Sequence, residues 1–255
     1  SMGCPVIMLS ATLPELRRAK LLMAYQYGAS RRTDSGLKLL DFRPKGWPEH
    51  RLSYPLVSVA SASGSKIATV SEDGDAADAE HDGSKSVSVH HLCLDGRSWI
   101  DDLKDRLADG GNAVVIRNTV NRAQESFKEL LDDEWFDDCE LTLIHARFLP
   151  DDRKRNENGL RRKYGREATT ENSLRPSKSV VVATQVVEQS LDVDFDYMIT
   201  DVCPMDLLLQ RIGRLHRHER DSRPVRVSEP IVAVDGWASG DDGLPKLDPG
   251  CKAVY

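Results

Sequence analysis

The strongest chemical signal in the sequence is the stretch QRIGRLHRH at positions 210–218. On a helix, Gln210, Arg214 and Arg217 fall at i, i+4 and i+7 and therefore share one face. Gly213 inside that helix costs about 1 kcal/mol relative to alanine, which close packing of another group against it would explain. Two forked guanidinium groups beside a glycine suit a polyphosphate. The alternative is a solvated basic helix paired with acidic neighbours. The opposite face carries the apolar residues Leu208, Ile212 and Leu215.

Three predicted turns also carry side chains suited to phosphate. Each follows an apolar strand-like run: Asn118 and Thr119 follow the first, Arg147 lies just after the second, and Thr184 and Gln185 follow the third. Helix N-termini at such turns present unpaired N–H groups to a ligand. Asn and Thr are also ordinary helix-capping residues, so each turn alone is weak evidence. Their repetition on successive strands favours a binding edge.

The elements that must position these residues alternate between strand and helix. This pattern predicts an α/β fold with a mostly parallel sheet flanked by helices on both faces. We expect strands at 5–9, 52–60, 86–94, 113–117, 141–145, 180–184 and 197–202. Helices are expected from Pro14 to Gly28, at 99–108, 122–131 and 151–164, and from Pro204 through the QRIGRLHRH stretch.

Composition excludes several classes of protein. The 255 residues are 40% hydrophobic, which supports a sizeable core and excludes a wholly disordered chain. No apolar run approaches the roughly 20 residues of a membrane span, so we expect no membrane association. A net charge of -6 excludes a histone-like polycation and confines any nucleic-acid contact to local patches. Five scattered cysteines without CxxC pairs indicate reduced thiols and a cytoplasmic location.

We expect no metal site in this sequence. His81-Asp82 lies in a predicted loop without further ligand histidines nearby. On a strand, His91 and Cys93 share a face, yet no second ligand pair follows them.

The residues resemble the ordered motifs of superfamily 2 helicases. Ser10-Ala11-Thr12 resembles motif III, Asn118-Thr119-Val120 motif IV, the ATQVVEQSLDVD stretch at 183–194 motif V, and QRIGRLHR motif VI. Three segments resemble most closely the Cas3 helicase-nucleases of type I CRISPR systems: VVEQSLDVDFD, the block from Ile144 to Arg153, and QRIGRLHRH. Other superfamily 2 motors, such as DEAH-like or RecG-like helicases, and a nonenzymatic RecA-like binding module remain alternatives.

The resemblance implies a particular domain organisation. Residues 1–28 would be the end of helicase lobe 1, with Ser10, Ala11 and Thr12 coupling the lobes, and 29–50 a connection. Residues 51–227 would form RecA-like lobe 2 with a mobile loop at 62–85, and 228–255 a linker toward a further domain. A strand at 5–9 without its lobe 1 neighbours would leave an apolar edge. We therefore expect residues 1–12 to be disordered, to pair with another molecule or to fold against lobe 2.

The resemblance also implies site roles. Arg214 and Arg217 would be arginine fingers facing the γ-phosphate of ATP, with Gln210 nearby. The nucleotide would further contact Asp192, Gly213 and Ser190. Such charge stabilisation is worth roughly 10³ to 10⁵ in rate. The backbone of single-stranded DNA would contact Asn118, Thr119, Arg147, Thr184 and Gln185.

Two motifs of an ATPase are absent from the sequence. There is no G-x-x-x-x-G-K-[ST] loop for the phosphates and no acidic run to hold Mg²⁺. We therefore expect a fragment that is inactive alone and depends on ATP and Mg²⁺ in a complete enzyme. The expected partners are lobe 1, an HD nuclease domain, single-stranded DNA and a Cascade-type CRISPR surveillance complex.

Overall fold

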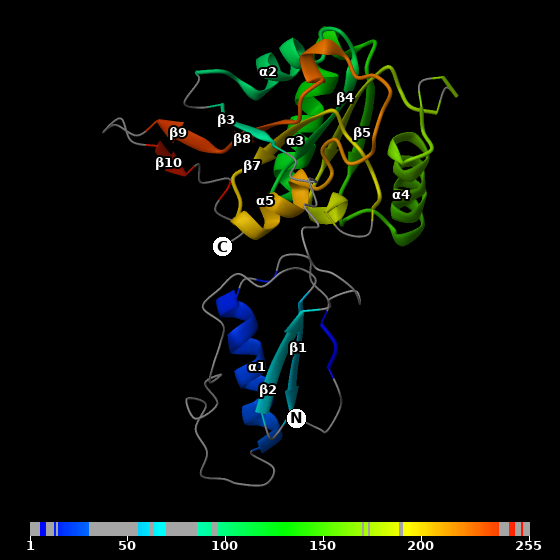
Figure 1. Ribbon diagram of the computed structural model, residues 1–255. Helices are drawn as coiled ribbons and strands as arrows, with labels where there is room; N and C mark the ends of the chain where they lie inside the picture. The colour runs from blue at the N-terminus through cyan, green and yellow to red at the C-terminus, as the bar shows by residue number, and fades with distance from the viewer. Residues whose placement is uncertain are drawn as a thin grey trace. The chain divides into compact units, whose positions relative to one another are not determined.

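The computed structural model describes residues 6–8, 13, 15–30, 56–61, 64–69, 86–92, 96–169, 171–172, 174–188, 191–239, 245–247 and 251. The chain divides into two compact units, residues 1–84 and residues 85–255 (Figure 1). Each unit has its own secondary structure.

The described residues of the first unit include one helix and one hairpin. Helix α1, Glu15–Ser30, forms where Pro14 predicts a helix start and continues past Gly28. Strands β1, Leu56–Ser61, and β2, Gly64–Thr69, pair antiparallel, with Leu56 opposite Thr69 and Ser61 opposite Gly64.

This hairpin corrects two predictions. The strand expected at 52–60 belongs to the first unit and does not join the lobe 2 sheet, and residues 64–69 of the expected loop at 62–85 form a strand. The connection between β1 and β2 is short, so the two strands pair antiparallel with each other, whereas a parallel neighbour would require a long crossover connection.

The expected strand at 5–9 is wrong at Val6, Ile7 and Met8, which adopt no strand conformation and are 61%, 86% and 56% exposed. A strand needs a hydrogen-bonding neighbour, and among the described residues of the first unit β1 and β2 pair only with each other. Ser10, Ala11 and Thr12 lie outside the described residues.

The second unit is built on a six-stranded, all-parallel sheet of order β3-β8-β7-β4-β6-β5. Its strands are β3, Ser88–His91; β4, Gly111–Ile116; β5, Glu140–Ile144; β6, Lys178–Ala183; β7, Tyr197–Asp201; and β8, Ile231–Asp235. Strands β4 and β7 are buried along their whole length, and β6 is buried after its first residue, Lys178, as parallel strands covered on both faces should be. The predicted α/β class is confirmed.

Helices cover both faces of this sheet (Figure 1). They are α2, Trp99–Arg106; α3, Val120–Leu131; α4, Pro150–Tyr164; and α5, Met205–Ile212, with short 3₁₀ turns η2, Glu134–Phe136; η3, Gln185–Val187; and η4, Val225–Val227. Successive side chains of a strand point to opposite faces of the sheet, so the sheet separates two hydrophobic cores. Val114 and Ile116 of β4 lie in one core, while Ala113 and Val115 lie in the other with residues of α2 and α3.

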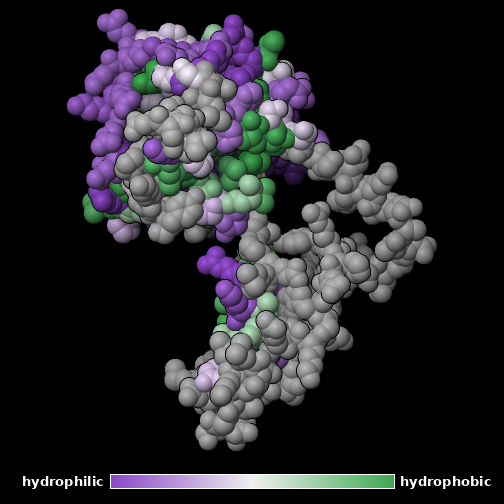
Figure 2. All heavy atoms as spheres, turned by 90° about the vertical axis from the view of Figure 1, so that its left-hand side faces the viewer, coloured by the Kyte–Doolittle hydropathy of each residue, from purple (hydrophilic) through white to green (hydrophobic). Residues whose placement is uncertain are grey.

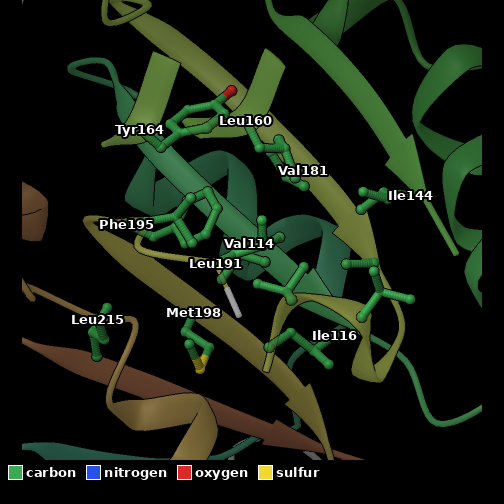
Figure 3. Packing of buried hydrophobic residues seen from close by; sticks show 14 of the residues in the cluster. Val114, Ile116, Ile144, Leu160, Tyr164, Val181, Leu191, Phe195, Met198 and Leu215 are labelled. Atoms are coloured by element: carbon green, nitrogen blue, oxygen red, sulfur yellow. The ribbon is translucent and has the colours of Figure 1, made fainter. Parts of the chain in front are cut away.

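Helix α4 closes the first of these cores. Leu160 and Tyr164 lie beside Val181 and Phe195 in Figure 3, and the ring centroids of Tyr164 and Phe195 are 5.0 Å apart. Leu191 and Met198 complete this packing. The core therefore includes the segment between β6 and β7, which carries part of the candidate site.

The expected linker at 228–255 is wrong at 231–235, because these residues form strand β8 between β3 and β7. Val232 and Ala233 are 0% exposed, one in each core. The run Ile-Val-Ala-Val is the pattern of a buried parallel strand, and burial on both faces favours its insertion into the sheet. Farther along, β9, Trp237–Ser239, pairs antiparallel with β10, Pro245–Leu247.

The surface of the second unit differs from this interior. In the space-filling view of Figure 2, hydrophilic residues cover most of its coloured surface, with smaller hydrophobic patches between them. No helix within the described residues is both long and apolar enough to cross a membrane.

Candidate functional site

The three predicted turns meet at one edge of the sheet. Because all six strands are parallel, the residues after β4, β5 and β6 lie at the same carboxyl edge, where ligands of open α/β sheets bind. Gln185, after β6, donates from Nε2 to the carbonyl of Asn118, after β4, at 3.0 Å. Arg147, after β5, donates from Nη1 to Oδ1 of Asn121 in α3 at 3.0 Å. The structure thus brings the predicted turns together.

Only some of these side chains face solvent. Asn118 is 5% exposed: its backbone N–H donates to Asp201 Oδ2 at 2.9 Å, and its Nδ2 donates to the carbonyl of Val202 at 2.8 Å. Thr184 is 2% exposed. Gln185 is partly buried, and Arg147 is exposed. Asn118 and Thr184 are therefore interior residues of the edge, while Arg147 and part of Gln185 are accessible.

Thr119 has the capping role that its residue type predicts. It is the N-cap of α3 in extended conformation, and its Oγ1 accepts a hydrogen bond from Arg122 N at 3.2 Å. The start of α3 is thereby fixed at the carboxyl end of β4.

A buried network of charges lies beneath this turn. Arg117 donates from Nη1 to Asp201 Oδ1 at 2.8 Å and also pairs with Asp235, and Arg122 donates from Nε to Asp201 Oδ1 at 3.0 Å. The Arg117 guanidinium also lies 4.8 Å from the ring centroid of Trp99. Burial opposes the charge on Arg122, but Asp201 and other neighbours raise its pKa overall. The network joins the ends of β4, β7 and β8, and sequence reasoning missed it.

The predicted helix through QRIGRLHRH is wrong beyond Ile212. Helix α5 ends there and Gly213 is its C-cap. The chain then pairs with the segment before β7: Phe195 N donates to the carbonyl of Arg214 at 3.0 Å, and His216 N donates to the carbonyl of Phe195 at 2.9 Å. His216 has a φ of 46°, in the left-handed region that residues other than glycine rarely adopt.

Gln210, Arg214 and Arg217 consequently share no helical face, because only Gln210 belongs to α5. The predicted explanation of Gly213 also changes. The nearest atoms to a Cβ placed there are the carbonyl oxygens of Gln210 at 3.3 Å and Leu209 at 3.6 Å, so the crowding comes from the last turn of its own helix.

Arg214 and Arg217 nevertheless converge on the segment after β6. Arg214, which is half-buried, donates from Nε to the carbonyl of Val187 at 3.3 Å and from Nη2 to that of Glu188 at 2.9 Å. Arg217 donates from Nε to Asp192 Oδ1 at 2.5 Å and remains 40% exposed.

The surroundings of Arg214 and Asp192 shift the pKa of each group. Burial, followed by the neighbouring charge of Arg217, lowers the pKa of Arg214. The hydrogen bond from Arg217 lowers the pKa of Asp192. Ser190 lies outside the described residues.

Arg211 is the residue of this stretch that the sequence interpretation passed over. It is 0% exposed and pairs through Nε with Glu188 Oε1 at 2.7 Å. Its Nη1 donates to Thr200 Oγ1 at 2.6 Å, and its Nη2 donates to Asn118 Oδ1 at 3.2 Å. An arginine three positions after Leu208, on the apolar side of the helix, is the signal that could have identified it.

Within the described ranges, no group of three His, Cys, Asp or Glu side chains could hold a metal ion. His91 lies at the end of β3, whereas Cys93, His81 and Asp82 lie outside the described residues.

Comparison with known proteins identifies the family of this chain. Residues 109–220 match the family described as CRISPR-associated nuclease/helicase Cas3, C-terminal. The chain is 37% identical over 254 residues to a CRISPR-associated nuclease/helicase Cas3 of Streptococcus thermophilus, covering 99% of this chain and 24% of that protein. It is 34% identical over 241 residues to the Cas3 endonuclease/helicase of Escherichia coli K12, covering 91% and 24%. The chain belongs to the Cas3 family.

It corresponds to the C-terminal helicase lobe of Cas3, as the motifs predicted, and spans about a quarter of the length of these curated relatives. Among solved structures, T. fusca Cas3 with ADP superposes with a TM-score of 0.73 at 31% identity, covering 98% of this chain and 28% of that one. T. fusca Cas3 with AMPPNP gives 0.72 at 30%, with the same coverage. The predicted RecA-like fold is thus confirmed.

Proposed function

We propose that this chain supplies the second RecA-like lobe of an ATP-dependent single-stranded DNA translocase or helicase that degrades DNA in CRISPR antiviral defence. Membership of the Cas3 family supports a nuclease/helicase context. Related solved structures are titled as complexes with ATP, ADP and AMPPNP, which supports ATP as the nucleotide. A further neighbour, with a TM-score of 0.68 at 29% identity, is titled a CRISPR RNA-guided surveillance complex.

The observation that carries this proposal is the convergence of Arg214 and Arg217 on the segment 187–192. Arg217 is the better placed of the two for a phosphate, because its side chain is 40% exposed and that of its Nε partner Asp192 is 60% exposed. An exposed ion pair of this kind contributes at most about 1 kcal/mol, so a more highly charged phosphate can compete with it. Arg214 is held by two carbonyl groups and would act beside it.

We propose the remaining nucleotide contacts from their nearness to Arg214 and Arg217 in the structure or in the sequence. Asp192 and Gly213 each accept a hydrogen bond from Arg217. Gln210 precedes Arg214 by four residues, and Ser190 precedes Asp192 in the same predicted motif. Mg²⁺ supplies charge neutralisation in phosphoryl transfer. The described residues do not form a carboxylate cluster suited to it, so we assign its ligands to the other lobe of the complete enzyme.

The DNA contacts are proposed at the exposed part of the carboxyl edge. Arg147 and Gln185 would meet the phosphate backbone, while Thr119, Asn118 and Thr184 would shape the turns that present them. Backbone contacts of this kind position a strand without reading its sequence. Lobe 1, an HD nuclease domain and a Cascade-type surveillance complex are the proposed partners, and a cytoplasmic location remains a prediction.

The test uses a Cas3 protein that contains both helicase lobes, with this chain as its second lobe. Arg217→Ala and Arg214→Ala should each lower the kcat of DNA-stimulated ATP hydrolysis by about 10³-fold, the lower end of what arginine fingers contribute. Arg226→Ala is the control for Arg217→Ala, because the Arg226 side chain is 45% exposed, close to the 40% of Arg217, and pairs with Asp105 and Asp109 elsewhere in the lobe. Unchanged turnover in both finger variants would refute the assigned roles. No turnover in the unaltered protein would favour a nonenzymatic binding module.

A further inference from the structure

A second cluster of buried charges lies at the opposite, amino-terminal side of β7. Asp194 and Asp196 directly precede this strand, and three arginines from other segments surround them: Arg175, Arg220 and Arg223. The exposed fraction is 8% or less for each of the five side chains. Such a cluster is maintained only where every charged group has close partners.

Asp194 is the most heavily bonded member of this cluster. Its Oδ2 accepts from Arg220 Nε at 2.8 Å, and both of its carboxylate oxygens accept from Arg223 Nη2 at 3.0 Å. Burial opposes ionisation of Asp194, but the charges of Arg223 and its neighbours outweigh burial and lower its pKa. Asp194 is therefore a rigid, charged acceptor.

The same carboxylate reaches the proposed arginine finger through the main chain. Asp194 Oδ1 accepts from the backbone N–H of Arg217 at 2.7 Å and lies 3.4 Å from that of His218. The preceding residues are held by the pairing of Arg214 and His216 with Phe195. Arg217 follows the end of α5 by several residues, so no helical hydrogen bonds fix its backbone.

Asp196 provides a contrast within the same cluster. It accepts from Asn112 N at 2.8 Å and from Arg175 Nη2 at 3.0 Å, and it pairs with Arg223. Among the described residues, Arg217 bonds to Asp194, Asp192 and Gly213 and not to Asp196. The two aspartates thus share burial and arginine partners but differ in their contact with Arg217.

We propose that Asp194 is a positioning residue for Arg217, fixing the main chain of the finger so that its guanidinium projects toward the nucleotide side. The inference rests on the proposed function of Arg217. A displacement of about 1 Å at a catalytic group can lower a rate about 10²-fold, so one main-chain anchor can have a large effect.

The test measures kcat and KM for DNA-stimulated ATP hydrolysis in the two-lobed Cas3 protein. Asp194→Ala should lower kcat about 10²-fold with little change in KM, because the finger acts in the transition state. Asp194→Asn should recover most of kcat, since its amide oxygen can still accept from Arg217 N. Asp196→Ala, the matched control, should lose stability comparably but keep kcat within about threefold, because it removes a buried partner without touching Arg217.

A double variant separates positioning from general damage. Asp194→Ala combined with Arg217→Ala should be no slower than Arg217→Ala alone, because the two residues act as one unit. Losses that multiply in the double variant, or an equal loss of kcat in Asp194→Ala and Asp196→Ala, would overturn the inference.

A further variant covers the case in which Asp194→Ala does not fold. Asp194→Glu keeps the negative charge among the three arginines but moves the acceptor by one methylene group, and it should also lower kcat. Unchanged kcat in Asp194→Glu overturns the inference. Unchanged kcat in Arg217→Ala would instead refute the proposed function of Arg217, so this single variant distinguishes the failure of that proposal from the failure of the inference about Asp194.

Discussion

Arg211 and Glu188 form an ion pair in the interior of the lobe, with 2.7 Å between Arg211 Nε and Glu188 Oε1 and at most 2% of either side chain exposed. The pair joins α5 to the segment after β6, and further bonds from Arg211 reach Asn118 and Thr200. One buried guanidinium therefore connects α5 to β7 and to the turns after β4 and β6. Its neighbours Arg214 and Arg217 can reach the segment 187–192 because α5 is anchored in this way.

Removing this guanidinium should destabilise the lobe. Arg211→Ala leaves the Glu188 carboxylate buried without its partner, so we expect the free energy of unfolding to fall by about 3–5 kcal/mol in urea denaturation. The double change Arg211→Met with Glu188→Leu should lose less, because no charge stays unpaired. Equal or greater loss in the double variant would contradict this account. Arg226→Ala, an exposed control, should change stability by about 1 kcal/mol or less.

Single-stranded DNA binding should depend on Arg147. Arg147→Ala in the two-lobed protein should weaken binding and reduce the slope of log K against log salt by about 0.7, the value for one phosphate contact on a single strand. Fluorescence anisotropy across a salt series measures both quantities. Lys128→Ala removes an exposed cation at the far end of α3 and serves as control. An identical slope for Arg147→Ala and the unaltered protein would exclude the contact.

Strand β8 should contribute to stability as part of the core. Val232 is 0% exposed and Val225 is 82% exposed, which makes the two valines a matched pair. Val232→Ala should lower the free energy of unfolding by about 2 kcal/mol through lost burial and a residual cavity. Val225→Ala should change it by less than about 0.5 kcal/mol. Similar values for the two variants would argue against the place of β8 within the sheet.

Asp235 should make stability depend on acid pH. Burial opposes its ionisation, but the charges of Arg117 and Arg122 lower its pKa in the folded state, below about 3.9 in the unfolded chain. A lowered folded pKa contributes stability that is complete above the unfolded value and is lost as pH falls through the folded one.

Asp235→Asn should therefore reduce the free energy of unfolding at pH 7 and flatten its decline below about pH 4. Urea unfolding at a series of pH values, compared between the variant and the unaltered chain, isolates this group from the other aspartates. A parallel pair of curves would show that the Asp235 charge has no such role.

Local sequence patterns predicted most of the second unit. Apolar runs such as Ala113–Ile116 form strands, and Thr119 caps α3, because hydrophobic periodicity and capping act over a few residues. The three turns meet because parallel strands place their carboxyl ends at one edge.

The same reasoning failed where distant segments decide the conformation. The helical pattern of QRIGRLHRH continues past Ile212, but pairing of Leu215 with Phe195 ends the helix. Residues 231–235 form a buried strand because β3 and β7 accept them on either side.

The sequence by itself determined the α/β class, the order of the motifs and the family, since these depend on residue types and spacing along the chain. Only the tertiary structure decided which arginine is buried at Glu188, which one is exposed at Asp192, and how Asp194 holds Arg217. The physical reason is that burial and hydrogen-bond partners are set by segments far apart in the chain. Chemically identical guanidinium groups in one short stretch thus acquire different roles.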